Sequence, residues 1–137
     1  MAAPLPLIYL TADEVIAFNH EILRRAGQTP APPRDRGLLE SALQRPQAAA
    51  HYESADVLTQ AALYMVGIAL NHPFVDGNKR TGYIAGMSFL HVNHAITITA
   101  DLNDIQMAVW LEQAVTRQLT FDEFVEHLRQ RFASARP

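Results

Sequence analysis

Residues 56–90 read DVLTQAALYMVGIALNHPFVDGNKRTGYIAGMSFL, and this stretch decides the fold. Over 56–71, apolar residues fall on nearly every side of a helical projection, which is typical of a helix buried at the centre of its domain. A second apolar segment, 83–90, follows a polar connection. Gly82 and Gly86 lie four residues apart and leave a smooth stripe for a neighbouring helix. The pattern predicts two central helices that pack as an antiparallel pair, joined by the polar residues.

Helical patterns precede this pair. Thr11 and Glu14 match a capping box, and the helix that they begin is expected to end at Gly27. A short second helix is predicted over 38–43, closed by Pro46. Residues 47–54 have no clear period and are expected to form an exposed loop or short hairpin.

Further helices are predicted after the pair. Residues 95–99 alternate and indicate a short extended piece. Asp101 or Asn103 is expected to cap the next helix, and Thr120 begins a second capping box. The fold class predicted for residues 1–137 is therefore all-α. We expect one domain of about six helices around a buried helical hairpin, with a short flap before the first helix of that hairpin.

Composition limits the function. The chain has 137 residues, of which 49% are hydrophobic and 18% charged, as in a single globular domain. Its net charge of -3 offers no broad basic surface, so direct nucleic acid binding is not expected. The absence of cysteine excludes disulfides and thiol nucleophiles. No basic, apolar leader and no apolar run of ~20 residues is found, so a soluble, cytoplasmic protein without membrane contact is expected.

The connection HPFVDGNKR, residues 72–80, carries the residue types that phosphoryl or nucleotidyl transfer needs. The imidazole of His72 can accept a proton from an attacking hydroxyl. The carboxylate of Asp76 can bind Mg²⁺ that is also held by phosphates. Gly77 and Asn78 allow a tight turn into the next helix, whose N-terminus is an anion site.

Two cations, Lys79 and Arg80, stand at the start of that helix. Cations there oppose the helix macrodipole, which indicates that a bound anion compensates. Each group also has a plainer interpretation: a histidine that caps a helix, an ordinary turn, a solvated helix start. The combination at fixed spacing favours a functional site. By contrast, His91 and His94 are three residues apart without a third ligand nearby, and a solvated helix end explains them better than a metal site.

The 72–80 run resembles the signature of the Fic/Doc family, H-P-F-x-[D/E]-G-N-G-R-x-x-R, and is closer still to that of its Doc ("death on curing") branch, H-x-F-x-D-[A/G]-N-K-R-T. Residues 36–47 are also similar to the segment that precedes the substrate flap in Doc-like proteins. The resemblance implies an all-α Fic fold, ATP and Mg²⁺ as cofactors, and transfer to a protein hydroxyl.

The resemblance also implies roles for individual residues. His72 would be the general base, and Asp76 would bind Mg²⁺. Gly77, Asn78, Lys79 and Arg80 would bind the phosphates of the nucleotide, and the 47–54 stretch would be the flap that aligns the target peptide. Members of the Doc branch are toxins that phosphorylate a threonine of elongation factor Tu and stop translation, and a Phd antitoxin folds onto them.

Two departures from the general Fic pattern bear on the reaction. Lys79 replaces a glycine that leaves room for the nucleotide in members that transfer AMP, and Tyr83 replaces their second arginine. A long cation in that space is expected to shift or invert the triphosphate, so phosphoryl transfer from the γ-phosphate is favoured over adenylylation. A non-catalytic partner-binding module is the alternative from another class. An internal inhibitory [S/T]-x-x-x-E-[G/N] helix is absent from the sequence, so restraint would come from a separate chain.

Overall fold

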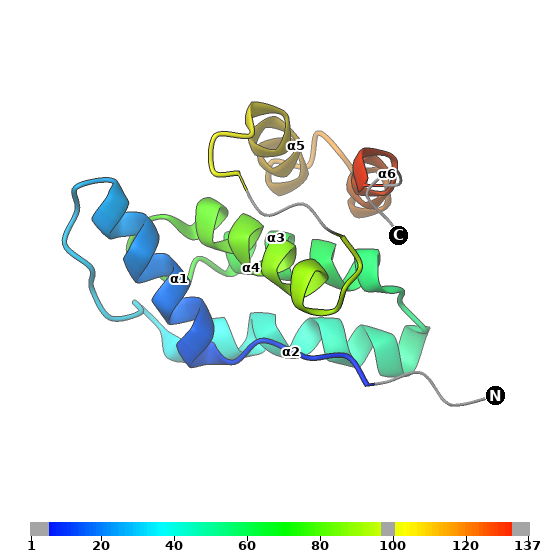
Figure 1. Cartoon of the computed structure of the whole chain (residues 1–137), viewed down its shortest axis with the longest axis horizontal. Helices are drawn as coiled ribbons and strands as arrows, with labels where there is room; N and C mark the ends of the chain where they lie inside the picture. The colour runs from blue at the N-terminus through cyan, green and yellow to red at the C-terminus, as the bar shows by residue number, and fades with distance from the viewer. Residues whose placement is uncertain (1–5, 97–100, 133–137) are drawn as a thin grey trace.

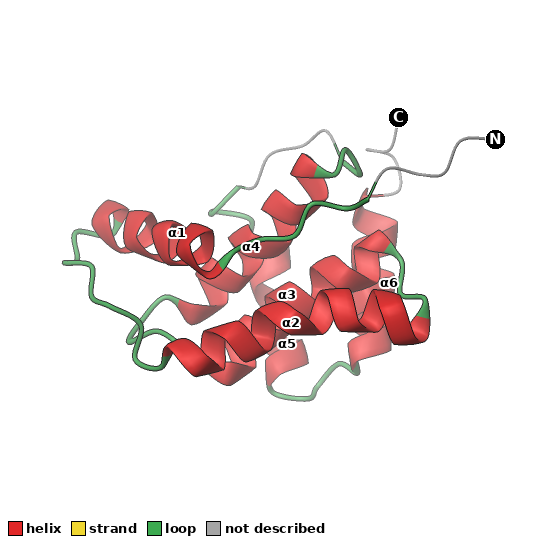
Figure 2. Ribbon diagram, turned by 90° about the horizontal axis from the view of Figure 1, so that it is seen from below, coloured by secondary structure: helices red, strands yellow, loops and turns green. Residues whose placement is uncertain are grey.

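The computed structural model describes residues 6–96 and 101–132, which form helices and no strands (Figure 2). The predicted all-α class is confirmed. Within these residues, none of the helices combines the length and the apolar character needed to cross a bilayer. The helices are α1 (Ala12–Arg25), α2 (Arg36–Glu53), α3 (Val57–Asn71), α4 (Asn78–Val92), α5 (Ile105–Val115) and α6 (Phe121–Phe132).

The centre of the molecule is the pair α3 and α4, as the apolar pattern of residues 56–90 predicts (Figure 1). In Figure 1, α2 lies on one side of this pair and α5 and α6 lie on the other. Ten of the fifteen residues of α3 are buried. Because α3 contacts four other helices, it has no solvated face, which explains why its sequence lacks a polar stripe.

Glycine determines how closely α4 approaches α3. A Cβ at Gly82 would lie 2.5 Å from the carbonyl oxygen of Met65, and one at Gly86 would lie 2.8 Å from that of Ala61. Gly82 contacts Met65, and the later Gly86 contacts the earlier Ala61, so the two helices run antiparallel, as predicted. This close contact fixes the end of α3 beside the start of α4.

The second helix differs from its prediction. α2 continues through Pro46 to Glu53, so residues 47–53 of the 47–54 stretch are helical, Ser54 is the C-cap, and the stretch is not an exposed loop or hairpin. Pro46 is buried, on the face that also carries Leu39, Ala42 and Ala49. Proline inside a helix costs about 3 kcal/mol. Burial of this face against α3 outweighs the local preference, and such tertiary packing is not visible in the local sequence.

The start of α5 differs from its prediction, whereas the start of α6 matches its prediction. The cap of α5 is Asp104, whose Oδ1 accepts a hydrogen bond from Met107 N at 3.1 Å. The side chain of Asp101 instead accepts from Asn103 N in the preceding turn, so neither predicted residue is the cap. The capping box of Thr120 and Glu123 is confirmed. Residues 97–99 of the predicted extended piece lie outside the described residues.

The segment before α1 is bound to the central pair. Leu10 N donates to the hydroxyl of Tyr64 at 3.1 Å, and burial raises the pKa of Tyr64 to about 12. The side chain of Asn93 binds both the N–H and the carbonyl of Ile8. These bonds hold α1 against α4, where it faces the connection between the central helices.

Candidate active site at the start of α4

The 72–78 connection is shaped by its own side chains. His72 ends α3 in the left-handed region, with φ of 54°. Phe74 is buried at 1% exposure and anchors the connection to the core. The amide of Asn78 accepts from Phe74 N and donates to the Phe74 carbonyl, each at 2.9 Å. The Asn78 side chain therefore holds the turn, so any phosphate that binds at this residue meets its backbone N–H.

The connector between α1 and α2 holds the same turn from outside. Arg34 donates from Nε and Nη2 to the carbonyl of His72, at 3.2 and 2.7 Å. Asp35 N donates to the Pro73 carbonyl at 3.2 Å, while the Asp35 side chain caps α2. These bonds oppose rotation of the backbone at His72. They therefore fix the backbone position from which its side chain extends.

Asn19 of α1 holds the other end of the turn. Its Nδ2 donates to the carbonyl of Asp76 at 2.9 Å and lies 3.2 Å from the Oγ1 of Thr81. The Asn19 side chain is 1% exposed, and it lies on a face of α1 whose other buried residues are apolar. Asn19 is not among the site residues that the sequence predicts. A polar residue among the apolar residues of an amphipathic helix was the signal that could have found it.

We predict that Asn19→Ala weakens the site as well as the fold. The carbonyl of Asp76 would lose its buried partner, which costs about 1–3 kcal/mol of unfolding free energy. The turn would also loosen, so affinity for MgATP should fall. Asn93→Ala is the control, because it also removes side-chain hydrogen bonds to a backbone segment, at the opposite end of α4. Urea denaturation and calorimetric titration check both variants; an Asn19→Ala protein with unchanged MgATP affinity would contradict the positioning role.

The N-terminus of α4 is open. Its N-cap is Gly77, and among the described residues no side chain caps its first N–H groups. The other helices begin with a side-chain cap from Thr11, Asp35, Asp56, Asp104 or Thr120. The free N–H groups and the helix dipole favour an anion at this end. Lys79 and Arg80 stand in this first turn, as the sequence predicts.

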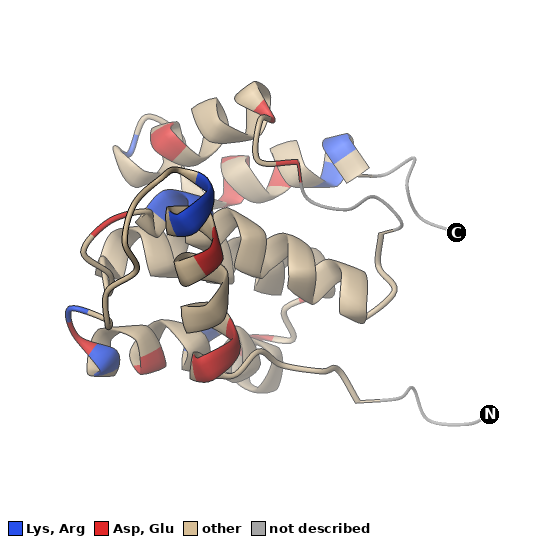
Figure 3. Cartoon of the chain, turned by 60° about the vertical axis from the view of Figure 1, so that its left-hand side comes forward, with Lys and Arg blue, Asp and Glu red and all other residues tan. Residues whose placement is uncertain are grey.

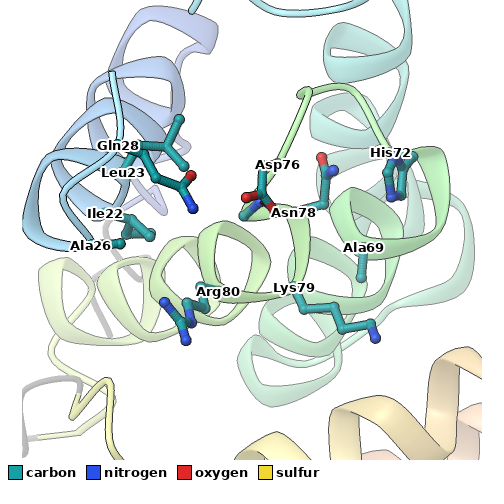
Figure 4. A pocket seen from close by; sticks show the side chains of 11 residues that line it. Ile22, Leu23, Ala26, Gln28, Ala69, His72, Asp76, Asn78, Lys79 and Arg80 are labelled. Carbon is teal, nitrogen blue, oxygen red and sulfur yellow. Dashed lines mark hydrogen bonds between the residues drawn. The ribbon is translucent and has the colours of Figure 1, made fainter. Parts of the chain in front are cut away.

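A cavity of about 400 Å³ lies over this N-terminus, between α1, α3 and α4 (Figure 4). It brings together all six residues predicted from the sequence, and residues of α1 and α3 complete the wall. Figure 3 shows basic residues on several parts of the chain, with acidic residues between them. The predicted residues that line it are His72, Asp76, Gly77, Asn78, Lys79 and Arg80.

The side chains that line this cavity fit a Mg²⁺ ion that phosphate also binds better than a metal ion that is bound by protein ligands alone. No group of three or more metal-binding side chains exists among residues 6–96 and 101–132. Asp76 is exposed, and its Oδ1 accepts from Gly77 N at 2.8 Å. One carboxylate beside a phosphate site is a usual ligand set for Mg²⁺, whose other ligands are phosphate oxygens and water. His91 and His94 are exposed at the far end of α4.

Comparison with known proteins agrees with this geometry. The model of the Fic/DOC family matches residues 9–90, which include α1 to α3 and most of α4. The chain is 35% identical over 97 residues to "Toxin Doc" of Mycolicibacterium smegmatis, covering 69% of this chain and 74% of that protein. The chain belongs to the Fic/DOC family. It is also 29% identical over 129 residues to "Protein kinase doc" of Escherichia phage P1, covering 93% of this chain and 98% of the relative.

In this member of the Fic/DOC family, the two cations of α4 leave the helix in different directions (Figure 4). Lys79 extends toward α5 and forms an ion pair with Glu112. The two side chains are 52% and 48% exposed, so the pair is weak enough to exchange for a phosphate. Tyr83, one turn further along α4, is buried. Burial raises the pKa of its hydroxyl above the ordinary value of a phenol.

We predict that Glu112→Gln tightens MgATP binding by about two- to fivefold, the range expected for an exposed ion pair. The carboxylate of Glu112 competes with phosphate for Lys79, and its removal frees that cation. Glu40→Gln is the matched control, since it breaks the exposed pair between Glu40 and Arg36 on α2. Calorimetric titration at low salt measures both. Weaker MgATP binding by Glu112→Gln would show that the carboxylate supports the site.

Proposed function

We propose that this chain is a Doc-like toxin that transfers the γ-phosphate of ATP to a threonine or serine hydroxyl of a translation protein, with elongation factor Tu as the first target to test. The observation that carries this proposal is the convergence of His72, Asp76 and the uncapped start of α4 on one cavity. The names of the two relatives, a toxin and a protein kinase, support it.

Each group has a part in the proposed reaction. The imidazole of His72 accepts the proton of the attacking hydroxyl. The hydroxyl oxygen then bonds to the γ-phosphorus, the bond from that phosphorus to the β–γ bridging oxygen breaks, and ADP leaves. The backbone N–H groups at the start of α4 and the side chain of Arg80 hold phosphate oxygens. Asp76 binds Mg²⁺, which neutralises phosphate charge when present.

The two departures in the motif support attack at the γ-phosphorus. Lys79 places a long cation where AMP-transferring members have glycine, and Tyr83 places a neutral ring where they have arginine. A triphosphate that meets Lys79 beside the start of α4 is expected to present its terminal phosphate to the hydroxyl. Transfer of AMP would need the α-phosphate in that position and is the competing reaction.

Incubation of the chain with elongation factor Tu and ATP labelled at either the α- or the γ-phosphate tests the proposal. Label is expected on elongation factor Tu only from the γ position. Label from the α position would replace the kinase by an adenylyltransferase. Label from neither would remove this target and leave a non-catalytic binding module as the next hypothesis.

A protein partner follows from the same proposal. A toxin of this kind needs an antitoxin, so we propose a Phd-like protein as the binding partner and the cytoplasm, where translation occurs, as the compartment. Co-expression with a gene that neighbours this one tests it: growth arrest caused by this chain should be relieved by the neighbouring product.

A further inference from the structure

Three consecutive residues at the end of α3 are bonded to the start of α2 and to the residues just before it. The side chain of Asn71 donates to the carbonyl of Leu38 at 2.9 Å. The carbonyl of His72 accepts two bonds from Arg34, and the carbonyl that follows it accepts from the N–H of Asp35. Arg34 precedes His72 by 38 residues, so a distant segment of the chain sets the position of this end of the turn.

The backbone of His72 adopts a conformation that a residue with a side chain does not favour. Its φ of 54° and ψ of 51° lie in the left-handed region, where the Cβ crowds the following carbonyl oxygen. Such a conformation persists where the surrounding structure holds it. Among residues 6–96 and 101–132, the hydrogen bonds to the His72 carbonyl come from Arg34 alone, through two N–H groups. A fork of two donors fixes the orientation of its acceptor more strictly than one donor does.

The guanidinium of Arg34 acts outside the cavity. Arg34 does not line the cavity over the start of α4, which His72 does line. Its side chain is exposed, and within the described part of the chain its hydrogen bonds are the two to the His72 carbonyl. An exposed side chain contributes little to the core. The effect of Arg34 should therefore fall on the turn and not on the fold.

We infer that Arg34 is a positioning residue, whose two bonds hold the His72 peptide in the orientation from which the imidazole reaches the attacking hydroxyl. This inference rests on the proposed function, in which His72 accepts the proton of that hydroxyl, and adds a residue from outside the 72–80 turn. Misplacement of a reacting group by about 1 Å can cost about 10²-fold in rate, so a restraint on the backbone of the base can control transfer. Arg34 acts through His72 and contacts neither the nucleotide nor the target.

Arg34→Ala tests the inference, with Arg36→Ala as its matched control. Arg36 is an exposed arginine two residues away, and its guanidinium pairs with Asp13 and Glu40 instead of the turn. The measurements on each full chain are single-turnover transfer from γ-labelled ATP to saturating elongation factor Tu, MgATP affinity by calorimetry, and thermal melting. Arg34→Ala should transfer about 10- to 10²-fold more slowly, with MgATP affinity and melting close to those of the wild type. Arg36→Ala should transfer as the wild type does.

The double variant Arg34→Ala/His72→Ala separates positioning from direct contact with a substrate. If Arg34 acts through the imidazole, its removal should change the rate of the His72→Ala protein by less than about twofold. A further loss of about tenfold in that background would overturn the inference, because Arg34 would then act independently of the base. Undiminished transfer by Arg34→Ala alone, or a loss confined to MgATP affinity, would also overturn it and leave the proposed function standing. A wild-type chain that transfers no phosphate would overturn the proposed function, and the inference with it.

Discussion

Replacing His72 by alanine should reduce transfer to the protein target by about 10²- to 10⁴-fold, the usual contribution of a general base. The imidazole is the proton acceptor in the proposed reaction, and it lines the cavity over the start of α4. Affinity for MgATP should change little, because the phosphates meet the N–H groups of α4 and the cations there. Single-turnover transfer and calorimetric titration together separate the loss of chemistry from the loss of binding.

His91→Ala is the matched control for this experiment. His91 is exposed in the last turn of the same helix, far from the cavity. It should keep wild-type transfer and wild-type MgATP affinity. Undiminished transfer by His72→Ala would remove that residue as the base.

The second large effect is expected on stability. Gly82→Ala should destabilise the chain by about 1–3 kcal/mol or more, the usual cost of overpacking a core. The added Cβ would lie 2.5 Å from the backbone oxygen of Met65, and a backbone atom cannot move away as a side chain can. The central helices must separate, which also moves His72 relative to Lys79. Urea denaturation should therefore show a lower midpoint, and transfer should fall with it.

Gly67→Ala is the control because it makes the same change in α3, where the new Cβ would lie 3.7 Å from its nearest neighbour, Ala42 Cβ. That is ordinary van der Waals contact. Since alanine is favoured over glycine in a helix by up to about 1 kcal/mol, this variant should be neutral or stabilised. Equal stability of Gly82→Ala and Gly67→Ala would contradict the role given to close contact at Met65.

The central pair and the position of the turn were predictable because their signals are local and long. Sixteen residues without a polar face predict a buried helix, and Gly82 with Gly86 predicts its close neighbour. The gathering of the six site residues in one cavity follows from the same prediction, because they lie within nine residues of sequence at one helix junction. Their chemical roles remain predictions.

Most of the wrong or missing predictions concern places where packing between residues distant in sequence decides local structure. Pro46 is a helix breaker by its own geometry, yet burial against α3 keeps α2 helical to Glu53. Asn19 is separated from Asp76 by 57 residues, and Lys79 from Glu112 by 33. The sequence can mark Asn19 as an unusual polar residue on a buried face, but it contains no signal that names the distant partner in either pair. The cap of α5 has a local cause. Asp101 accepts a hydrogen bond from Asn103 N in the preceding turn, and the N-cap of the helix is Asp104.

The most direct measurement of the central claim is calorimetric titration of the full chain with ATP, with and without Mg²⁺. The claim is that the turn at residues 72–80 and the open start of α4 bind a magnesium triphosphate. We expect ATP to bind with Mg²⁺ present, to bind much more weakly without it, and to lose the Mg²⁺ dependence in Asp76→Asn. An absence of Mg²⁺-dependent nucleotide binding by the wild-type chain would contradict the account.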